Sequence, residues 1–337
     1  MASTLTRSNP ARASCGRSRP TISIHTRSLF KESWSPSRCR NCNTSATSRE
    51  VADLIFGLES AAPLTSEHWK PSISPSKSLS WIGADMTAPH RSLVLSIYAP
   101  ALGDDTGRTL SVVRGLEYAL PGLRLGWTIS DKGEFIPVPQ RDEWLAQAEA
   151  KKTLPMLCNG KEDDLVTVSG WERPAGISSG GQPQFEVHAE LPLDATRIAA
   201  SVAVLETMAE GAHAFWGRLM PSSVAAEMAQ QVRHSTKELH APPRGLPALN
   251  LTEDIPSPEI PHHLGWLNYW SAATSRALGF PAHDRDVNLL SRSRRTATGG
   301  WVLRLTDEPL DLDNPAHLDA LLRAYERFPG IGGRFIP

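Results

Sequence analysis

Apolar and polar residues first alternate regularly at residues 92–99, where the chain reads "SLVLSIYA". Leu93, Leu95 and Ile97 fall on one side of an extended chain, so the pattern predicts a strand with one buried face. The apolar residues that follow are spaced as in a helix, and that spacing ends at Pro121-Gly122. A strand and then a helix are therefore the first elements that the pattern predicts.

The same two patterns, strand-like alternation and helical spacing of apolar residues, recur toward the carboxy terminus. They predict further strands in "LRLGWTI", "LVTVSGW", "FEVHAEL" and "GWVLRLT". They predict further helices in "QRDEWLAQAEAKK", "DATRIAASVAVLETMAEGAHAFW", "DRDVNLLSRSRR" and "NPAHLDALLRAYERF". Asp194 and Asn314 stand where the side-chain caps of two of these helices are expected. The mixture predicts an α+β fold with a mostly antiparallel sheet packed against helices.

Prolines interrupt the pattern at residues 241–261, where "APPRGLPALNLTEDIPSPEIP" contains six of them. Proline is disfavoured in helix interiors and central strands, so this stretch is expected to be a crossing segment or linker. Only one clear strand is predicted beyond it, and a single strand needs partners from an earlier sheet. We therefore expect one continuous domain over residues 86–337.

Residues 1–85 lack this periodicity and are rich in Ser, Thr and Arg. Such a segment cannot bury enough apolar area to offset its conformational entropy, so we expect it to be disordered. A misplaced start, with the folded protein beginning at Met86, explains this segment best; a genuine disordered tail and a targeting leader are the alternatives.

The pair Cys39 and Cys42 in "CRNC" has the spacing of half a zinc or redox site, but no second half is recognisable, and we expect no metal.

Charge is divided unevenly along the chain. Residues 1–85 contain 11 Lys or Arg and 6 Asp or Glu, which leaves 24 of the 35 basic and 30 of the 36 acidic residues from Met86 onward. No run of 18 apolar residues exists, and the four cysteines do not form a disulfide framework. A cytoplasmic protein without membrane or nucleic-acid partners is expected, and the oligomeric state is left open.

Common catalytic motifs are missing from the sequence. It contains no G-x-S-x-G, H-E-x-x-H, G-x-x-x-x-G-K-[ST] or post-strand G-x-G-x-x-G pattern, so we assign no catalytic residue and no cofactor. In "FEVHAEL", alternation places Glu186, His188 and Glu190 on one face, where a histidine between carboxylates would have a raised pKa. The simpler interpretation is the solvated face of an antiparallel sheet; a metal or acid/base site is the alternative.

A second cluster lies in "PHHLGWLNYW", which is dense in aromatic and imidazole groups. Such residues serve binding surfaces and protein cores equally well. The candidate binding residues here are His262, His263, Trp266, Asn268, Tyr269 and Trp270. If "GWLNYWSAATSRAL" is helical, Trp266 and Trp270 share one face, and we expect at least one of them, Trp270 first, to lie in the core. Adjacent histidines point in different directions, so a shared metal is not expected.

Three shorter polar stretches have structural interpretations. In "AHDRD", Asp284 beside His283 is expected to cap a helix rather than to form a catalytic pair. The basic "SRSRR" suits the last turn of a helix, and "DEPLDLDN" lacks the pattern of a calcium loop and is expected to be a polar connection.

Several segments resemble a known family. "EYALPGLRLGWTIS", "FEVHAELPLDA", "IPHHLGWLNYWSAATSRALGFP" and "TATGGWVLRLTDEPLDLDNPAHLDALLRAYERFPGIGG" resemble an uncharacterised bacterial family, domain of unknown function 5953, from Met86 almost to the end. The Gly-Trp-Leu segment with "LTDEPLDLDNPAHL" is also similar to the ending of the Immunity protein 52 family of polymorphic toxin systems. That similarity implies a cytoplasmic protein that neutralises a toxin, although neither family supplies a site residue.

These observations favour a non-enzymatic binding protein, of the kind an immunity-type inhibitor represents, whose partner is a protein toxin. Two other classes stay open. One is an enzyme of unrecognised class that uses His188 with Glu186 or Glu190. The other is a structural protein that self-associates through residues 266–270.

Overall fold

The computed structural model describes residues 92–103, 107–232 and 241–334. Our expectations for residues 1–85, namely disorder, a start at Met86 and the "CRNC" pair, lie outside the described residues. The extent of the domain, 86–337, likewise stays a prediction.

The described strands form one antiparallel sheet of ten strands in the order β3-β2-β4-β5-β6-β1-β7-β8-β10-β9. Their bounds are β1 Ser92–Pro100, β2 Trp127–Ile129, β3 Phe135–Pro137, β4 Thr153–Cys158, β5 Thr167–Arg173, β6 Gln184–Pro192, β7 Trp216–Pro221, β8 Leu267–Trp270, β9 Ser293–Arg295 and β10 Trp301–Arg304. The predicted α+β class with a mostly antiparallel sheet is confirmed.

The described residues also form seven α-helices. They are α2 Arg108–Ala119, α3 Arg141–Ala150, α4 Ala195–Ala212, α5 Ser222–Ala229, α6 Ala272–Ala277, α7 Val287–Leu290 and α8 Pro315–Arg327. Asp194 caps α4 by accepting hydrogen bonds from the backbone of Thr196 and Arg197, and Asn314 caps α8 in the same way through Ala316. Both predicted caps are confirmed.

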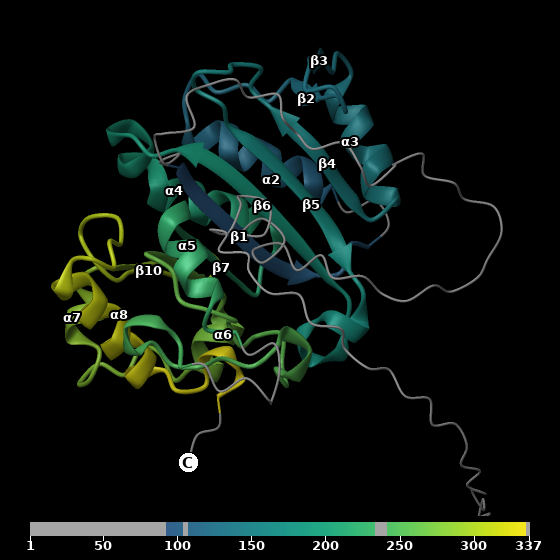
Figure 1. The fold of residues 1–337 in the computed structure, drawn as a ribbon. Coiled ribbons are helices and arrows are strands. Elements are labelled where there is room, and N and C mark those ends of the chain that lie inside the picture. The colour runs from purple at the N-terminus through teal and green to yellow at the C-terminus, as the bar shows by residue number, and fades with distance from the viewer. Residues whose placement is uncertain (1–91, 104–106, 233–240, 335–337) are drawn as a thin grey trace, which may run out of the picture. The chain divides into compact units, whose positions relative to one another are not determined.

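The two faces of the sheet are covered by different parts of the chain. Helix α4 packs against the central strands and α2 packs on α4, and Figure 1 shows α2 behind the strands. On the opposite face the carboxy-terminal segments pack against β8 and β10. There the ring of Trp270 meets Phe280 and Phe328 at centroid distances of 5.5 and 4.8 Å. The core therefore lies on both sides of the sheet in its carboxy-terminal half.

The proline-rich stretch runs between two distant parts of the structure. It contains the 3-10 helices Pro243–Gly245 and Thr252–Asp254. Gly180 donates a backbone hydrogen bond of 2.8 Å to Ile255, and Asn250 donates one of 2.9 Å to Gly332. Residues 241–261 thus connect the β5–β6 loop to the end of the described chain.

Several predicted elements differ from the structure. The helix that begins after Asp194 was expected to continue to Trp216, but α4 ends at Ala212. The next residue, His213, has a left-handed φ of 55°, and Trp216 begins β7. Residues 267–270 form β8 instead of a helix, and residues 293–295 of "SRSRR" form β9 instead of a helix end. Strands β3 and β4 were not expected. In these cases strand pairing decides the conformation, with a distant partner for β7 and β8 and with the neighbouring strand of a hairpin for β3 and β9.

Helices α2 and α4 approach each other closely where both contain glycine. A Cβ atom added to Gly115 would lie 2.7 Å from the carbonyl oxygen of Thr207, and one added to Gly211 would lie 2.9 Å from Ser111. Thr207 Oγ1 also donates a 2.8 Å hydrogen bond to the Gly115 carbonyl. The glycines therefore set the distance between the two helices.

We predict that Gly115→Ala lowers the free energy of unfolding by about 1 to 3 kcal/mol because the added methyl forces the helices apart. Intrinsic propensity alone would favour alanine by about 1 kcal/mol, so the expected sign is opposite to that of an exposed helix position. Urea denaturation measures the change. Arg114→Ala, at an exposed position of the same helix, is the control and should change stability by less than about 1 kcal/mol. A stabilised Gly115→Ala protein would contradict the close approach.

Candidate functional site

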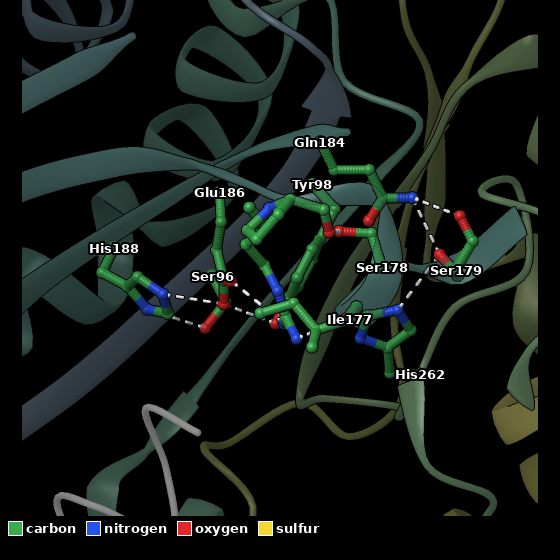
Figure 2. A network of polar contacts seen from close by, with 11 residues as sticks. Ser96, Tyr98, Ile177, Ser178, Ser179, Gln184, Glu186, His188 and His262 are labelled. Atoms are coloured by element: carbon green, nitrogen blue, oxygen red, sulfur yellow. Dashed lines mark hydrogen bonds and ion pairs between the residues drawn. The ribbon is translucent and has the colours of Figure 1, made fainter. Parts of the chain in front are cut away.

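The register of the sheet gathers polar side chains from three strands. Tyr98 on β1 stands opposite Glu186 on β6, which stands opposite Trp171 on β5. One pair further along, Ser96 stands opposite His188. Because side chains alternate between the faces of a strand, all five project from the face opposite α4. Figure 2 shows this polar network around Glu186.

Glu186 is the centre of the network, and its side chain is buried. Its Oε1 atom accepts a 2.7 Å hydrogen bond from the Tyr98 hydroxyl and lies 2.9 Å from His188 Nε2. Its Oε2 atom accepts a 3.1 Å hydrogen bond from Arg173, whose other terminal nitrogen donates to the Ile177 carbonyl at 2.7 Å. Both carboxylate oxygens therefore have partners.

The electrostatics of the network keep Glu186 ionised. Burial alone would raise its pKa, but contacts with His188, the positive charge of Arg173 and the hydrogen bond from Tyr98 outweigh burial and lower the pKa to about 2. Burial, and then the charge of Glu186, raise the pKa of the Tyr98 hydroxyl above its usual value. At neutral pH, Tyr98 is thus a neutral donor to a carboxylate anion.

The prediction that this face of β6 is solvated is wrong at the centre of the strand. Glu186 is 3% exposed and His188 only partly exposed, whereas Glu190, two residues further along β6, is exposed. Trp171 stacks on the His188 ring at 5.0 Å, so aromatic side chains cover the polar groups. The structure thus brings His188 to Glu186 and leaves Glu190 apart. An anion with both oxygens bonded and a pKa of about 2 is poorly suited to acid/base work near neutrality.

His262 extends the network from the far end of the sequence. Its ring lies 4.6 Å from Tyr98 and 4.7 Å from Trp216, and its Nε2 is 3.4 Å from the Ser179 hydroxyl. Burial, followed by the positive charge of Arg173, lowers the pKa of His262 to about 3, so the ring is neutral. Sequence reasoning singled out both His262 and Glu186 but could not predict that they share one network.

The neighbouring His263 has different surroundings. Both of its ring nitrogens are buried without a hydrogen-bond partner. Burial, and then the charge of Arg218, lower its pKa well below the usual value. Within the described ranges no three His, Cys, Asp or Glu side chains form a group that could hold a metal ion.

The other members of the predicted binding set are core residues. Trp266, Asn268, Tyr269 and Trp270 are 1 to 3% exposed. Trp266 donates a 2.9 Å hydrogen bond to the Thr306 carbonyl, and Tyr269 donates one of 3.1 Å to Glu210 on α4. The core position expected of Trp270 is found for Trp266 as well. That these residues form a binding surface stays a prediction.

The acidic residue at the N-cap of α7 is Asp286 and not the expected Asp284. Asp284 and His283 are exposed, and the N-cap position belongs to Asp286. Asp286 is 1% exposed and accepts two hydrogen bonds from Arg327, at 2.6 and 2.9 Å. Its carboxylate joins this turn to α8, so the prediction of Asp284 as the cap is wrong.

A surface that sequence reasoning missed lies at the β3 end of the sheet. Six large apolar side chains are exposed among the described residues, and four of them belong to the end of α2 and to β2, β3 and β4. We call these four the apolar end surface: Tyr118, Trp127, Ile136 and Met156, exposed by 81, 37, 46 and 45%. Figure 1 shows β2, β3 and β4 together at one end of the sheet. Residue type could not reveal this surface, because such side chains are usually buried.

The fold and these side chains define an α+β protein built on one ten-stranded antiparallel sheet, with a buried polar network around Glu186 and an apolar surface at one end. The chain belongs to the family described as a domain of unknown function (DUF5953), whose model matches residues 104–336. The predicted membership is thereby confirmed, while the likeness to Immunity protein 52 stays a prediction.

Comparisons beyond the family add little. Among solved structures the chain is similar to the Pseudomonas aeruginosa T6SS protein PA0821, with 13% sequence identity and a TM-score of 0.45, over 71% of this chain and 73% of that chain. A likeness at this level supports no conclusion about function. The comparison with curated proteins found no match. None of the described helices is long and apolar enough to cross a membrane.

Proposed function

We propose that this protein is a non-enzymatic binding protein that contacts a protein partner through the apolar end surface. The observation that carries the proposal is the exposure of Tyr118, Trp127, Ile136 and Met156 at one end of the sheet. Aromatic residues and methionine are enriched in the cores of protein interfaces, and tryptophan and tyrosine dominate binding hot spots.

The geometry around β2 makes this surface two-sided. Thr128 is paired with Ile136, and Trp127 with Pro137, so Trp127 and Ile136 project from opposite sides of the β2–β3 hairpin. Thr128 Oγ1 donates a 2.8 Å hydrogen bond to the Met156 carbonyl, which ties the hairpin to β4. A partner that enclosed the end of the sheet would contact both sides, as a protein can and a small molecule cannot.

For the partner we propose a protein toxin in the cytoplasm, which this protein neutralises by binding. The proposal rests on the predicted resemblance of the carboxy-terminal segment to the immunity family and on the excess of 30 acidic over 24 basic residues from Met86 onward. A negative net charge favours association with a basic partner by long-range steering.

The two rival functions have weaker support. An enzyme using His188 with Glu186 would need a carboxylate that exchanges a proton near neutral pH, but both oxygens of Glu186 accept hydrogen bonds and its pKa is lowered to about 2. Self-association through residues 266–270 would need exposed rings, but Trp266 and Trp270 are 2% and 1% exposed.

We predict that Trp127→Ala weakens binding of the toxin by at least about 30-fold, which corresponds to about 2 kcal/mol for a hot-spot residue. The first step is to look beside this protein's gene for a large secreted protein with a toxin-like carboxy-terminal domain, and the absence of such a gene would count against the proposal. That domain is then the ligand, titrated by calorimetry and co-expressed in a growth assay. Val287→Ala is the control, because Val287 is an equally accessible apolar side chain, 62% exposed, on the distant helix α7.

The outcomes separate the two parts of this proposal. Tight binding with growth rescue that is lost in Trp127→Ala and kept in Val287→Ala supports both parts. Tight binding that both variants retain would remove the apolar end surface from the proposal. If the wild-type chain neither bound the domain nor restored growth, the toxin would be the wrong partner.

A further inference from the structure

A pocket of about 360 Å³ opens beside Trp127, in the angle between the end of α2, the β4–β5 loop and the start of α4. Its volume falls within the roughly 300–1,000 Å³ that is typical of small-molecule sites. Apolar side chains of the α2 end, Leu120, Pro121 and Leu123, form one part of its lining, and the indole of Trp127 forms another. Three cationic side chains, Arg124, Lys161 and Arg197, also line it, together with the polar Asn159, Asp164 and Thr196.

The walls of this pocket are fixed by local contacts. The backbone of Gly160 lies directly against the Trp127 indole, since a Cβ atom there would be 2.7 Å from the ring. Gly160 also has a φ of +68°, which disfavours other residues. Asn159 fixes the same loop by donating a 2.7 Å hydrogen bond to the Asp164 carbonyl and accepting one of 3.2 Å from the Val166 amide. A pocket whose walls are held in this way needs little rearrangement to bind a ligand.

The pocket lining contains three cationic side chains and one acidic side chain, and they differ in how firmly they are paired. Asp164, the acidic member of the lining, is paired with Arg197 at 2.6 Å, and Arg197 is paired again with Asp194 at 3.0 Å. Arg124 is only loosely paired, 3.7 Å from Glu117, with 72% of its side chain exposed. The Lys161 side chain is exposed as well. Arg124 and Lys161 are thus available to an incoming anion.

The start of α4 limits which anions the pocket can bind. The backbone N–H groups of Thr196 and Arg197 already donate to Asp194 at 2.8 and 3.0 Å, so they cannot bind a phosphate in the usual way for a helix start. What the pocket offers is an aromatic wall, an apolar floor and two exposed cations. That combination matches a carboxylate attached to a flat apolar body.

We propose that this pocket binds a small aromatic carboxylate. The ring lies against Trp127 and the α2 end, and the carboxylate is held by Arg124 and Lys161. The site is independent of the polar network around Glu186. It adjoins the apolar end surface through Trp127, but it needs no protein partner.

The test is a titration of the full chain, without partner, with indole-3-acetate and with the neutral indole-3-acetamide, followed by NMR. The Trp127 indole N–H signal is identified by its loss in Trp127→Phe. We expect saturable shifts of this signal with a Kd of about 1 mM for the carboxylate, typical of a ligand of this size, and at least about tenfold weaker binding of the amide.

Charge-removing variants test whether Arg124 and Lys161 hold the carboxylate. The double variant Arg124→Gln with Lys161→Gln should weaken binding of indole-3-acetate by at least about fivefold. Lys132→Gln removes one positive charge from an exposed position of the β2–β3 turn outside the pocket, and it should change the Kd by less than about twofold; Lys161→Gln alone is the single-charge variant to compare with it. Equal binding of acid and amide, equal loss in both charge variants, or no shift at about 10 mM ligand would each overturn the proposal. Because no partner is present, such a failure would leave the proposed protein interface untouched.

Discussion

Replacing Glu186 with glutamine is expected to lower the free energy of unfolding by about 3 to 5 kcal/mol at pH 7, the range for removing one partner of a buried ion pair. The substitution keeps the size of the side chain and removes its charge. Arg173, with 16% of its side chain exposed, then loses its carboxylate partner, while Tyr98 and His188 lose a charged acceptor. Urea denaturation monitored by circular dichroism measures the difference.

The control is Glu190→Gln, which changes the same residue type on the same face of the same strand. Glu190 is exposed and has no comparable set of contacts among the described residues, so its replacement should change stability by less than about 0.5 kcal/mol. Similar effects of the two substitutions would show that the network around Glu186 does not stabilise the fold.

The same network predicts a pH dependence. Glu186 has a pKa of about 2 in the folded protein against an ordinary value of 4.5, so the unfolded chain binds the proton first as the pH falls. The contribution of Glu186 is complete above pH 4.5 and decreases between that value and pH 2. The stability gap between wild type and Glu186→Gln should therefore narrow by roughly 2 kcal/mol from pH 5 to pH 3. A gap that stayed constant over this range would contradict the lowered pKa.

Trp270→Ala should destabilise the protein by about 3 to 5 kcal/mol, because a large core side chain is lost and a cavity remains. Trp270 is 1% exposed, and its ring meets Phe280 and Phe328, which join the sheet to the carboxy-terminal elements. Thermal and urea unfolding measure the effect.

Trp127→Ala is the matched comparison, since it removes the same side chain from a position that is 37% exposed. It should cost less than about 1.5 kcal/mol, and the variant should remain folded for the binding experiment. If Trp270→Ala unfolded at the same urea concentration as wild type, the assignment of this ring to the core would be wrong. Comparable losses in both variants would instead place Trp127 in the core and weaken the case for the apolar end surface.

The local pattern of apolar and polar residues was sufficient to predict the helices and strands that bury only one of their faces. The alternation in residues 92–99 predicted β1, and the helical spacing after residue 108 predicted α2. The paired strands β5 and β6 were both expected, and so were the caps Asp194 and Asn314. These features depend on residues within a few positions of one another, so the amino-acid order contains what is needed to identify them.

The candidate site was predictable only in its parts. Glu186, His188 and His262 were all singled out by residue type, but Tyr98 and Arg173, which complete the network, were not. The face of β6 was expected to be solvated because its residues are polar. At Glu186 it is buried and at His188 it is half-buried, because Tyr98 from β1 and Trp171 from β5 contact these two side chains, whereas Glu190 remains exposed.

The sequence by itself determined the α+β class, the order of the long elements and the two helix caps. The tertiary structure decided that residues 216–221 and 267–270 are strands, that the aromatic cluster around Trp270 fills the core, and that Trp127 stays exposed. It also decided that Glu186 is a buried anion. The physical reason is the range of the interactions involved: caps and periodic spacing act within a few residues, whereas strand pairing and burial depend on partners that can be more than 90 residues away, as Ser96 is from His188.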